Sequence, residues 1–263
     1  MQRSGINIRL ILMVGIMAFS VISYYMKSQV NPITGEKQHI DISPEQEVAM
    51  GLQSAPEMAG QFGGLYNDAK VQNSIKAIGA KLIKSGHLEN SPYKFDFHVL
   101  ADPETVNAFA LPGGQIFITV GLLKRLENED QIAGVLGHEA GHVVNRHSAE
   151  QMAKQGMWQG MVQGVAVGTS GNGMSGTQVA QMVSQMMNLK YGRTDELESD
   201  KYGLRYMDAA GYKPEQMIRV MEILEEAGGG KGQERSEFSS SHPSPENRII
   251  KIKEEIAKIR GEK

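Results

Sequence analysis

A segment of helical periodicity, residues 130–148, contains the motif His138-Glu139-Ala140-Gly141-His142. Apolar residues flank the motif on both sides, so the sequence predicts a helix that continues through it. In a helix, residues four apart lie on one face, with Cβ atoms about 6 Å apart. Both imidazoles can therefore bind the same metal ion, and Glu139 beside them can reach a water on that metal.

The other ligands of such a site are limited because the chain contains no cysteine. A catalytic zinc ion held by two histidines needs a third protein ligand, which here must be His, Glu or Asp. In the acidic helix start at residues 195–200, Glu196 and Asp200 share a face while Glu198 points away. Glu196 can complete the site, and Asp200 can accept the free N–H of a ligating histidine. The alternative is an exposed acidic helix start, favoured by the helix dipole.

The rest of the pattern predicts an α+β fold, mainly helical, with a small β-sheet beside the motif helix. Alternating residues predict a strand at 93–100, and a second strand is predicted at 115–120, after the turn Pro112-Gly113-Gly114. A first helix is expected to open at Ser43. Further helices are expected at 69–84, 121–127, 130–148, 151–167, 177–190, 194–209, 214–227 and 245–260.

Residues 151–190 are unusual because glycines 156, 160, 164 and 168 recur at every fourth position. A helix here would present a flat glycine face that lets another backbone approach closely. The sequence predicts a helical hairpin with its tip at Gly168–Thr177. Its methionines favour packing within the hairpin, and the alternative is a role in substrate binding.

An uncharged, largely apolar run covers Leu10–Met26, with Arg3 and Arg9 before it and Lys27 after it. Seventeen residues is the lower limit for a membrane-spanning helix. No A-x-A-like site follows, so an uncleaved signal anchor is favoured over a cleaved signal peptide. The basic residues before the run predict an exported remainder. The expected layout is an anchor at 1–27, a linker at 28–42 and one domain at 43–263.

Composition narrows the possible functions further. The 263 residues include 27 basic and 30 acidic side chains, for a formal net charge of −3. This balance, without a basic stripe, gives no electrostatic basis for binding nucleic acid. The absence of cysteine excludes a disulfide framework and a thiol nucleophile.

Several segments together form a recognisable set. They are residues 107–114 (NAFALPGG), 138–147 (HEAGHVVNRH), 196–200 (ELESD), His242-Pro243 with Arg248, and 30–35 (VNPITG). The set resembles the zinc metallopeptidases of family 48, the zincin group that includes HtpX-like, BepA-like and Oma-like proteins and the CaaX prenyl proteases. The similarity spans about residues 30–250. One departure is Ser199, where the family usually has alanine; both residues are small, so the site should not be disturbed.

The resemblance implies a role for each matched position. The implied ligands of one Zn²⁺ per chain are His138, His142 and Glu196. Glu139 matches the general base, and Asp200 matches an acid that supports a ligating histidine.

The resemblance also implies a substrate-binding segment and a further catalytic histidine. Asn107, Ala108, Phe109 and Ala110 match an edge strand to which a peptide substrate adds as an extra strand. His242 matches a histidine that stabilises the transition state or occupies the open zinc position as a latch, and both roles stay open. His147 also recurs in the family and is interpreted as structural.

The implied function is a zinc-dependent endopeptidase for misfolded or unassembled envelope proteins. The expected location is the bacterial inner membrane, reached through the N-terminal helix, with the catalytic domain in the periplasm; cleavage of that helix would give a secreted or periplasmic protein. The alternative is an envelope chaperone or assembly factor with latent protease activity. A structural zinc site is disfavoured, because it would be closed by four protein ligands and would not need Glu139.

Overall fold

The computed structural model describes residues 8–169, 191–227, 237–242 and 247–261. The chain divides into two compact units, each described here by itself. The larger unit comprises Ser43–Ser148 and Asn188–Lys263, and the smaller unit comprises Met1–Ile42 and Ala149–Met187.

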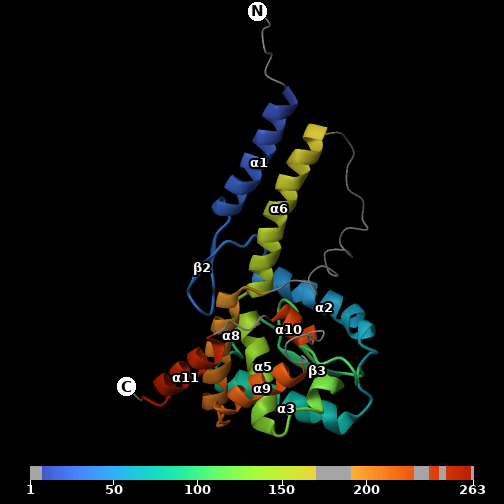
Figure 1. Ribbon diagram of the computed structural model, residues 1–263, viewed down its shortest axis with the longest axis vertical. Helices are drawn as coiled ribbons and strands as arrows, with labels where there is room; N and C mark the ends of the chain where they lie inside the picture. The colour runs from blue at the N-terminus through green and yellow to red at the C-terminus, as the bar shows by residue number, and fades with distance from the viewer. Residues whose placement is uncertain (1–7, 170–190, 228–236, 243–246, 262–263) are drawn as a thin grey trace, which may run out of the picture. The chain divides into compact units, whose positions relative to one another are not determined.

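The larger unit contains a small sheet and many helices (Figure 1). Its strands β3 (Asp96–Leu100), β4 (Ala108–Ala110) and β5 (Gln115–Thr119) lie in the order β3-β5-β4, with β3 parallel and β4 antiparallel to β5. The helices described in this unit are α2 (Pro44–Gln61), α3 (Ala69–Ser85), α4 (Val120–Leu123), α5 (Glu129–Val144), α8 (Arg193–Ala209), α9 (Gln216–Ala227), α10 (Glu237–Ser241) and α11 (Arg248–Ile259). The predicted class, α+β and mainly helical, is confirmed.

Helix α5, which carries the motif, is packed among α3, α8 and α9 (Figure 1). It also contacts strand β4. Its contact with α8 is the closest of these. A Cβ atom at Gly141 would lie 2.7 Å from the Ser199 carbonyl oxygen, and one at Gly203 would lie 2.9 Å from the His138 backbone nitrogen. Only glycine allows so close an approach of the two backbones. As a result, the acidic start of α8 lies directly beside the motif of α5.

The predicted helix 130–148 is divided into two. Helix α5 ends at Val144, and the side-chain amide of its C-cap residue Asn145 donates to the Gly141 carbonyl at 2.8 Å. Arg146 follows with a φ of 58°, a left-handed conformation that is uncommon for a residue other than glycine. Helix α6 (His147–Thr169) then begins at once. The hydrophobic periodicity continues across residues 145–146, so this pattern did not indicate the boundary between the two helices.

Other elements follow the predictions with shifts at their ends. The predicted strand 93–100 begins only at Asp96, because the Lys94 backbone N–H donates to the Gly113 carbonyl in the turn instead of to a strand. Helix α10 was not predicted. The predicted helix 177–190 and most of the hairpin tip lie outside the described residues.

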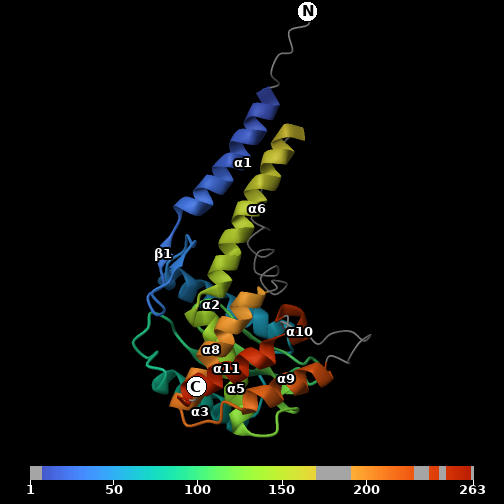
Figure 2. The ribbon, with the colours of Figure 1, turned by 60° about the vertical axis from the view of Figure 1, so that its left-hand side comes forward.

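In the smaller unit, α1 (Ile8–Met26) lies alongside the part of α6 that begins at residue 149 (Figure 2). Gly160 of α6 abuts Ser20 of α1, whereas a Cβ atom at Gly156 would meet open space. The close neighbour at Gly160 is thus a side chain, and the predicted approach of another backbone to the glycine face stays a prediction. The predicted extended linker contains a short antiparallel hairpin of β1 (Gln29–Val30) and β2 (Lys37–Gln38).

The apolar run of residues 10–26 forms most of α1, which also takes in Ile8 and Arg9. In the part of the chain that the structure describes, no helix is both long enough and apolar enough to cross a membrane. The membrane anchor predicted at residues 1–27 stays a prediction.

Candidate metal centre

The two imidazoles of the α5 motif converge. The Nε2 atoms of His138 and His142 lie 3.1 Å apart, and both side chains are buried. Each ring therefore turns one nitrogen toward a common point, as the spacing of four residues predicts.

Helix α8 contributes a carboxylate to the same point. Glu196 Oε2 lies 3.5 Å from His138 Nε2, and Glu196 Oε1 lies 3.5 Å from His142 Nε2. The Glu198 carboxylate lies elsewhere, with Oε2 3.1 Å from His147 Nε2. The structure thus brings Glu196, and not Glu198, to the two histidines.

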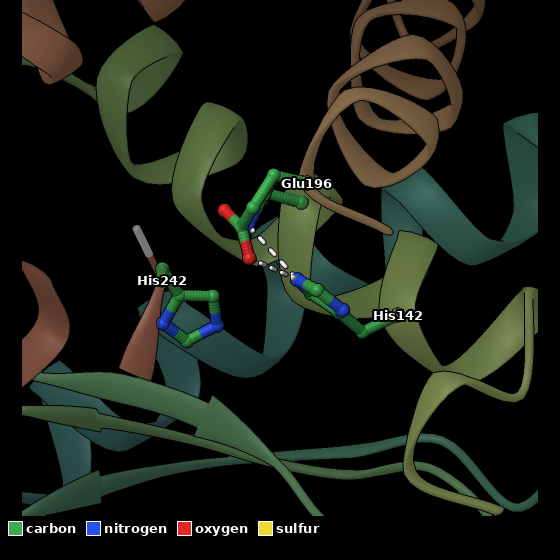
Figure 3. Close-up of side chains that lie close together, drawn as sticks. His142, Glu196 and His242 are labelled. Atoms are coloured by element: carbon green, nitrogen blue, oxygen red, sulfur yellow. Dashed lines mark hydrogen bonds and ion pairs between the residues drawn. The ribbon is translucent and has the colours of Figure 1, made fainter. Parts of the chain in front are cut away.

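His242, the residue after α10, completes a four-residue group with His138, His142 and Glu196. One ligand atom from each of the four lies within 4.8 Å of all the others. Figure 3 shows the Glu196 carboxylate and the rings of His142 and His242 turned toward one shared space. Burial lowers the pKa of His242 to about 4, so at neutral pH its ring is uncharged and has a lone pair to offer a metal.

The polar atoms of this group fit a cation. Within the described residues, both carboxylate oxygens of Glu139 and Nε2 of His242 are buried without a hydrogen-bond partner. The Glu196 oxygens make ion-pair contacts but no hydrogen bond. Buried polar atoms left in this state are unfavourable, and a bound cation would relieve them. Imidazole nitrogens and a carboxylate oxygen are ligands that Zn²⁺ prefers, so the group suits one zinc ion.

A charge network lies behind His138. Its Nδ1 is 2.9 Å from Asp200 Oδ1. Arg248, at the start of α11, donates from Nε and Nη2 to the two Asp200 oxygens at 2.7 and 2.8 Å, and its Nη1 lies 2.9 Å from Glu196 Oε2. Burial alone raises the pKa of Asp200, but Arg248 outweighs burial and holds that pKa below its usual value. Asp200 thus lies where the sequence predicts, as an ionised acceptor behind His138.

Glu139 lies next to the group and is fully buried. Its Oε1 is 3.6 Å from His242 Nε2. Burial raises the pKa of Glu139 to about 7; His138 and Arg248 oppose this shift, and the nearby Glu196 adds to it. A carboxyl group with a pKa near 7 can both take up and release a proton at neutral pH.

The predicted substrate segment, residues 107–110, lies at the edge of the sheet. Strand β4 (Ala108–Ala110) pairs with β5 on one side and packs against α5. The Asn107 side-chain oxygen is buried without a hydrogen-bond partner among the described residues. Nearby, the Phe238 backbone N–H of α10 donates to the Val106 carbonyl at 3.2 Å, which ties the segment carrying His242 to the start of this edge.

The sequence did not predict three contacts of the site. Arg248 was noted only as part of a motif, and His147 was interpreted as structural although its Nδ1 lies 2.9 Å from His142 Nδ1. The Tyr191 ring stacks on His142 with ring centroids 3.9 Å apart, and no sequence pattern marks this residue. The recurrence of His147 and Arg248 in the motif set was the one available signal.

Comparisons with known proteins agree with this geometry. The model of Peptidase family M48 matches residues 69–256. The chain is similar to Mitochondrial metalloendopeptidase OMA1 of Schizosaccharomyces pombe, with 30% identity over 233 residues, 88% of this chain and 67% of the relative. It is 25% identical to Beta-barrel assembly-enhancing protease of Escherichia coli over 237 residues, 87% of this chain and 47% of the relative.

A third relative, Metalloprotease YcaL of Escherichia coli, is 29% identical over 182 residues, 68% of each chain. The chain therefore spans about half the length of the assembly-enhancing protease and about two thirds of the other two. The matched region contains α5, α8 and His242, and hence the whole four-residue group. The chain belongs to peptidase family M48, a family of zinc metallopeptidases.

Proposed function

We propose that this chain is an endopeptidase that hydrolyses peptide bonds of misfolded or unassembled envelope proteins. The observation that carries the proposal is the four-residue group with the buried Glu139 carboxylate beside it, in a chain of a zinc metallopeptidase family. The name of the relative Beta-barrel assembly-enhancing protease supports substrates that are β-barrel proteins still to be assembled. An extracytoplasmic location is part of the same proposal. The division into a signal anchor or signal peptide (1–27), a linker (28–42) and a peptidase domain (43–263) is part of the same proposal.

In this proposal His138, His142 and Glu196 hold the zinc ion. When bound, zinc supplies a Lewis acid that polarises the scissile carbonyl and lowers the pKa of water. The Glu139 carboxylate takes a proton from the attacking water and returns it to the leaving amine nitrogen.

Substrate binding is proposed at β4, by addition of an extended peptide to the sheet edge at residues 107–110. Main-chain hydrogen bonds give affinity for an extended chain of almost any sequence. This mode suits unfolded substrates, since a folded protein rarely offers a free extended strand. The unpartnered Asn107 side-chain oxygen supports the proposal, because it can accept an N–H from a peptide at this edge.

His242 is proposed as a latch in the resting state and as a hydrogen-bond donor in the active state. Its uncharged ring within the four-residue group supports the latch, because a fourth protein ligand leaves no open position on zinc. The same contact favours a second candidate function, an assembly factor whose protease activity is latent. If the latch dominates, His242→Ala raises cleavage of unfolded substrate; if the donor role dominates, it lowers turnover about 100-fold. Unchanged turnover would contradict both roles.

The full chain, incubated with unfolded casein, tests the activity. We expect cleavage that a chelator stops and added zinc restores. Glu139→Gln should keep one zinc ion per chain but lose cleavage, because this carboxylate is the base and not a ligand. Glu129→Gln is the matched control, an exposed glutamate at the start of the same helix, and should behave as the parent.

Two results would contradict the proposal: cleavage that persists in the Glu139→Gln variant, or cleavage that is insensitive to chelation. The envelope part of the proposal is tested by comparing an unfolded outer-membrane β-barrel protein with the same protein folded in detergent. Equal cleavage of both forms would contradict selection of unassembled substrates.

A further inference from the structure

The two ring nitrogens of His142 have different neighbours. Its Nε2 faces the four-residue group, 3.1 Å from His138 Nε2 and 3.5 Å from Glu196 Oε1. Its Nδ1 faces away from the group and lies 2.9 Å from His147 Nδ1. The other nitrogen of His147, Nε2, lies 3.1 Å from Glu198 Oε2. A continuous line of contacts therefore runs from the metal-facing side of His142 to a carboxylate.

Metal binding by His142 through Nε2 would fix the proton positions along this line of contacts. If His142 binds a metal through Nε2, its remaining proton is on Nδ1, which then donates. His147 Nδ1 must accept that hydrogen bond, so the His147 proton is on Nε2. That N–H in turn points at the Glu198 carboxylate, which accepts without any further requirement. Each contact thus has one donor and one acceptor, and the order cannot be reversed while the metal is bound.

The local fold holds His147 in this place. His147 is the first residue of α6, directly after the left-handed Arg146 that ends the run from α5. Arg146 is buried and makes an ion pair with Glu47 of α2, with Nε 2.7 Å from Glu47 Oε1. A left-handed conformation is unfavourable at arginine, and this buried pair is a contact that holds it. The turn brings the His147 ring back beside His142 and buries it almost completely.

We propose that His147 and Glu198 are positioning residues, a relay that fixes the metal-binding tautomer and the ring orientation of His142. The proposal rests on the metal site of the proposed function. A purely structural role for His147 is the rival explanation. Against it stands the identity of the two partners: His147 Nδ1 meets the one nitrogen of His142 that does not face the metal group, and His147 Nε2 meets a carboxylate. Ser199 Oγ also lies 3.3 Å from His147 Nδ1. This contact is longer than the 2.9 Å between His147 Nδ1 and His142 Nδ1, so His142 is the nearer partner.

The test uses the full chain with zinc, and the zinc dissociation constant is measured by competition with a chromophoric chelator. His147→Leu removes the acceptor and should raise that constant about 10- to 100-fold. His147→Asn should restore most of the affinity, because its side-chain oxygen takes the place of Nδ1. Glu198→Ala should raise the constant by a smaller factor, and Asp208→Ala, an exposed carboxylate on the same helix, should leave it unchanged.

Two further measurements separate positioning from structure. Thermal unfolding of the zinc-free variants should match the zinc-free parent for His147→Asn and Glu198→Ala. The visible spectrum of the Co²⁺-substituted protein should change in His147→Leu and return toward that of the parent in His147→Asn, since it reports ligand geometry.

The relay is overturned if His147→Leu and Glu198→Ala bind zinc as tightly as the parent. It is also overturned if His147→Asn fails to recover affinity while its zinc-free form unfolds as the parent does. Failure of the parent chain itself to bind zinc is a different result, which overturns the metal site of the proposed function and the relay with it.

Discussion

His138 and His142 both turn Nε2 toward the four-residue group, but the side chains that contact the Nδ1 atoms of the two rings differ. Behind His138 lie Asp200 and Arg248, whose side chains are 3% and 2% exposed. Behind His142 lie His147 and Glu198, and the Glu198 side chain is 36% exposed. One imidazole is therefore backed by a buried ion pair, and the other by a second imidazole that leads to a partly solvated carboxylate.

The difference indicates where the site is most sensitive to substitution. A buried ion pair is costly to break, because the remaining charge keeps its desolvation penalty without its partner. A partly exposed carboxylate is screened by water, so its loss costs much less. Substitutions on the His138 side should therefore have larger effects than comparable substitutions on the His142 side.

The largest effect is expected for Arg248→Met. This change leaves Asp200 and Glu196 buried without their cation, and it should lower the free energy of unfolding of the zinc-free protein by about 3–5 kcal/mol. Urea denaturation measures it. Arg205→Met is the matched control, because Arg205 is half-exposed in its pair with Glu255 and should cost about 1 kcal/mol or less. Equal losses of unfolding free energy in the two variants would contradict the idea that the buried ion pair is more costly to break than the half-exposed one.

A smaller effect, on metal binding, is expected for Asp200→Asn. The amide still accepts from His138 Nδ1 but no longer carries the charge that pairs with Arg248. Zinc affinity should fall about 10- to 100-fold, and by more than in Glu198→Ala. Chelator competition on both variants, side by side, gives the comparison. A greater loss in Glu198→Ala would show that the partly solvated branch is the more important one.

The smallest effect is expected for Ser199→Ala, at the position where the family resemblance implies alanine. Ser199 Oγ approaches the same His147 nitrogen that His142 already occupies, so its loss removes a redundant contact. Unfolding free energy should change by about 0.5 kcal/mol or less, the lower end for a hydrogen bond. Urea denaturation and zinc competition on this variant check the prediction. A loss approaching that of His147→Leu would mean that Ser199, and not His142, is the main partner of His147.

The parts of the site that sequence predicts are those set by local periodicity. The pairing of His138 with His142, and the choice of Glu196 over Glu198, both follow from helical spacing within one segment. What the sequence does not reveal depends on contacts between distant segments. Arg248 reaches Asp200 across 48 positions, and the turn at Arg146 is held by Glu47, 99 positions earlier. The same holds for the fold. The helix boundary at residues 145–146 depends on a contact with a distant segment, and the local hydrophobic pattern continues across it.

The most direct test of the metal site is anomalous diffraction at the zinc edge from crystals of the zinc-loaded full chain. We expect one peak per chain, about 2.0–2.2 Å from His138 Nε2, His142 Nε2 and a Glu196 oxygen. Density for His147 and Glu198 in the same crystals would lie behind His142 and away from the peak. A zinc peak at Glu198, or one that does not contact both histidines of α5, would contradict a metal site formed by His138, His142 and Glu196.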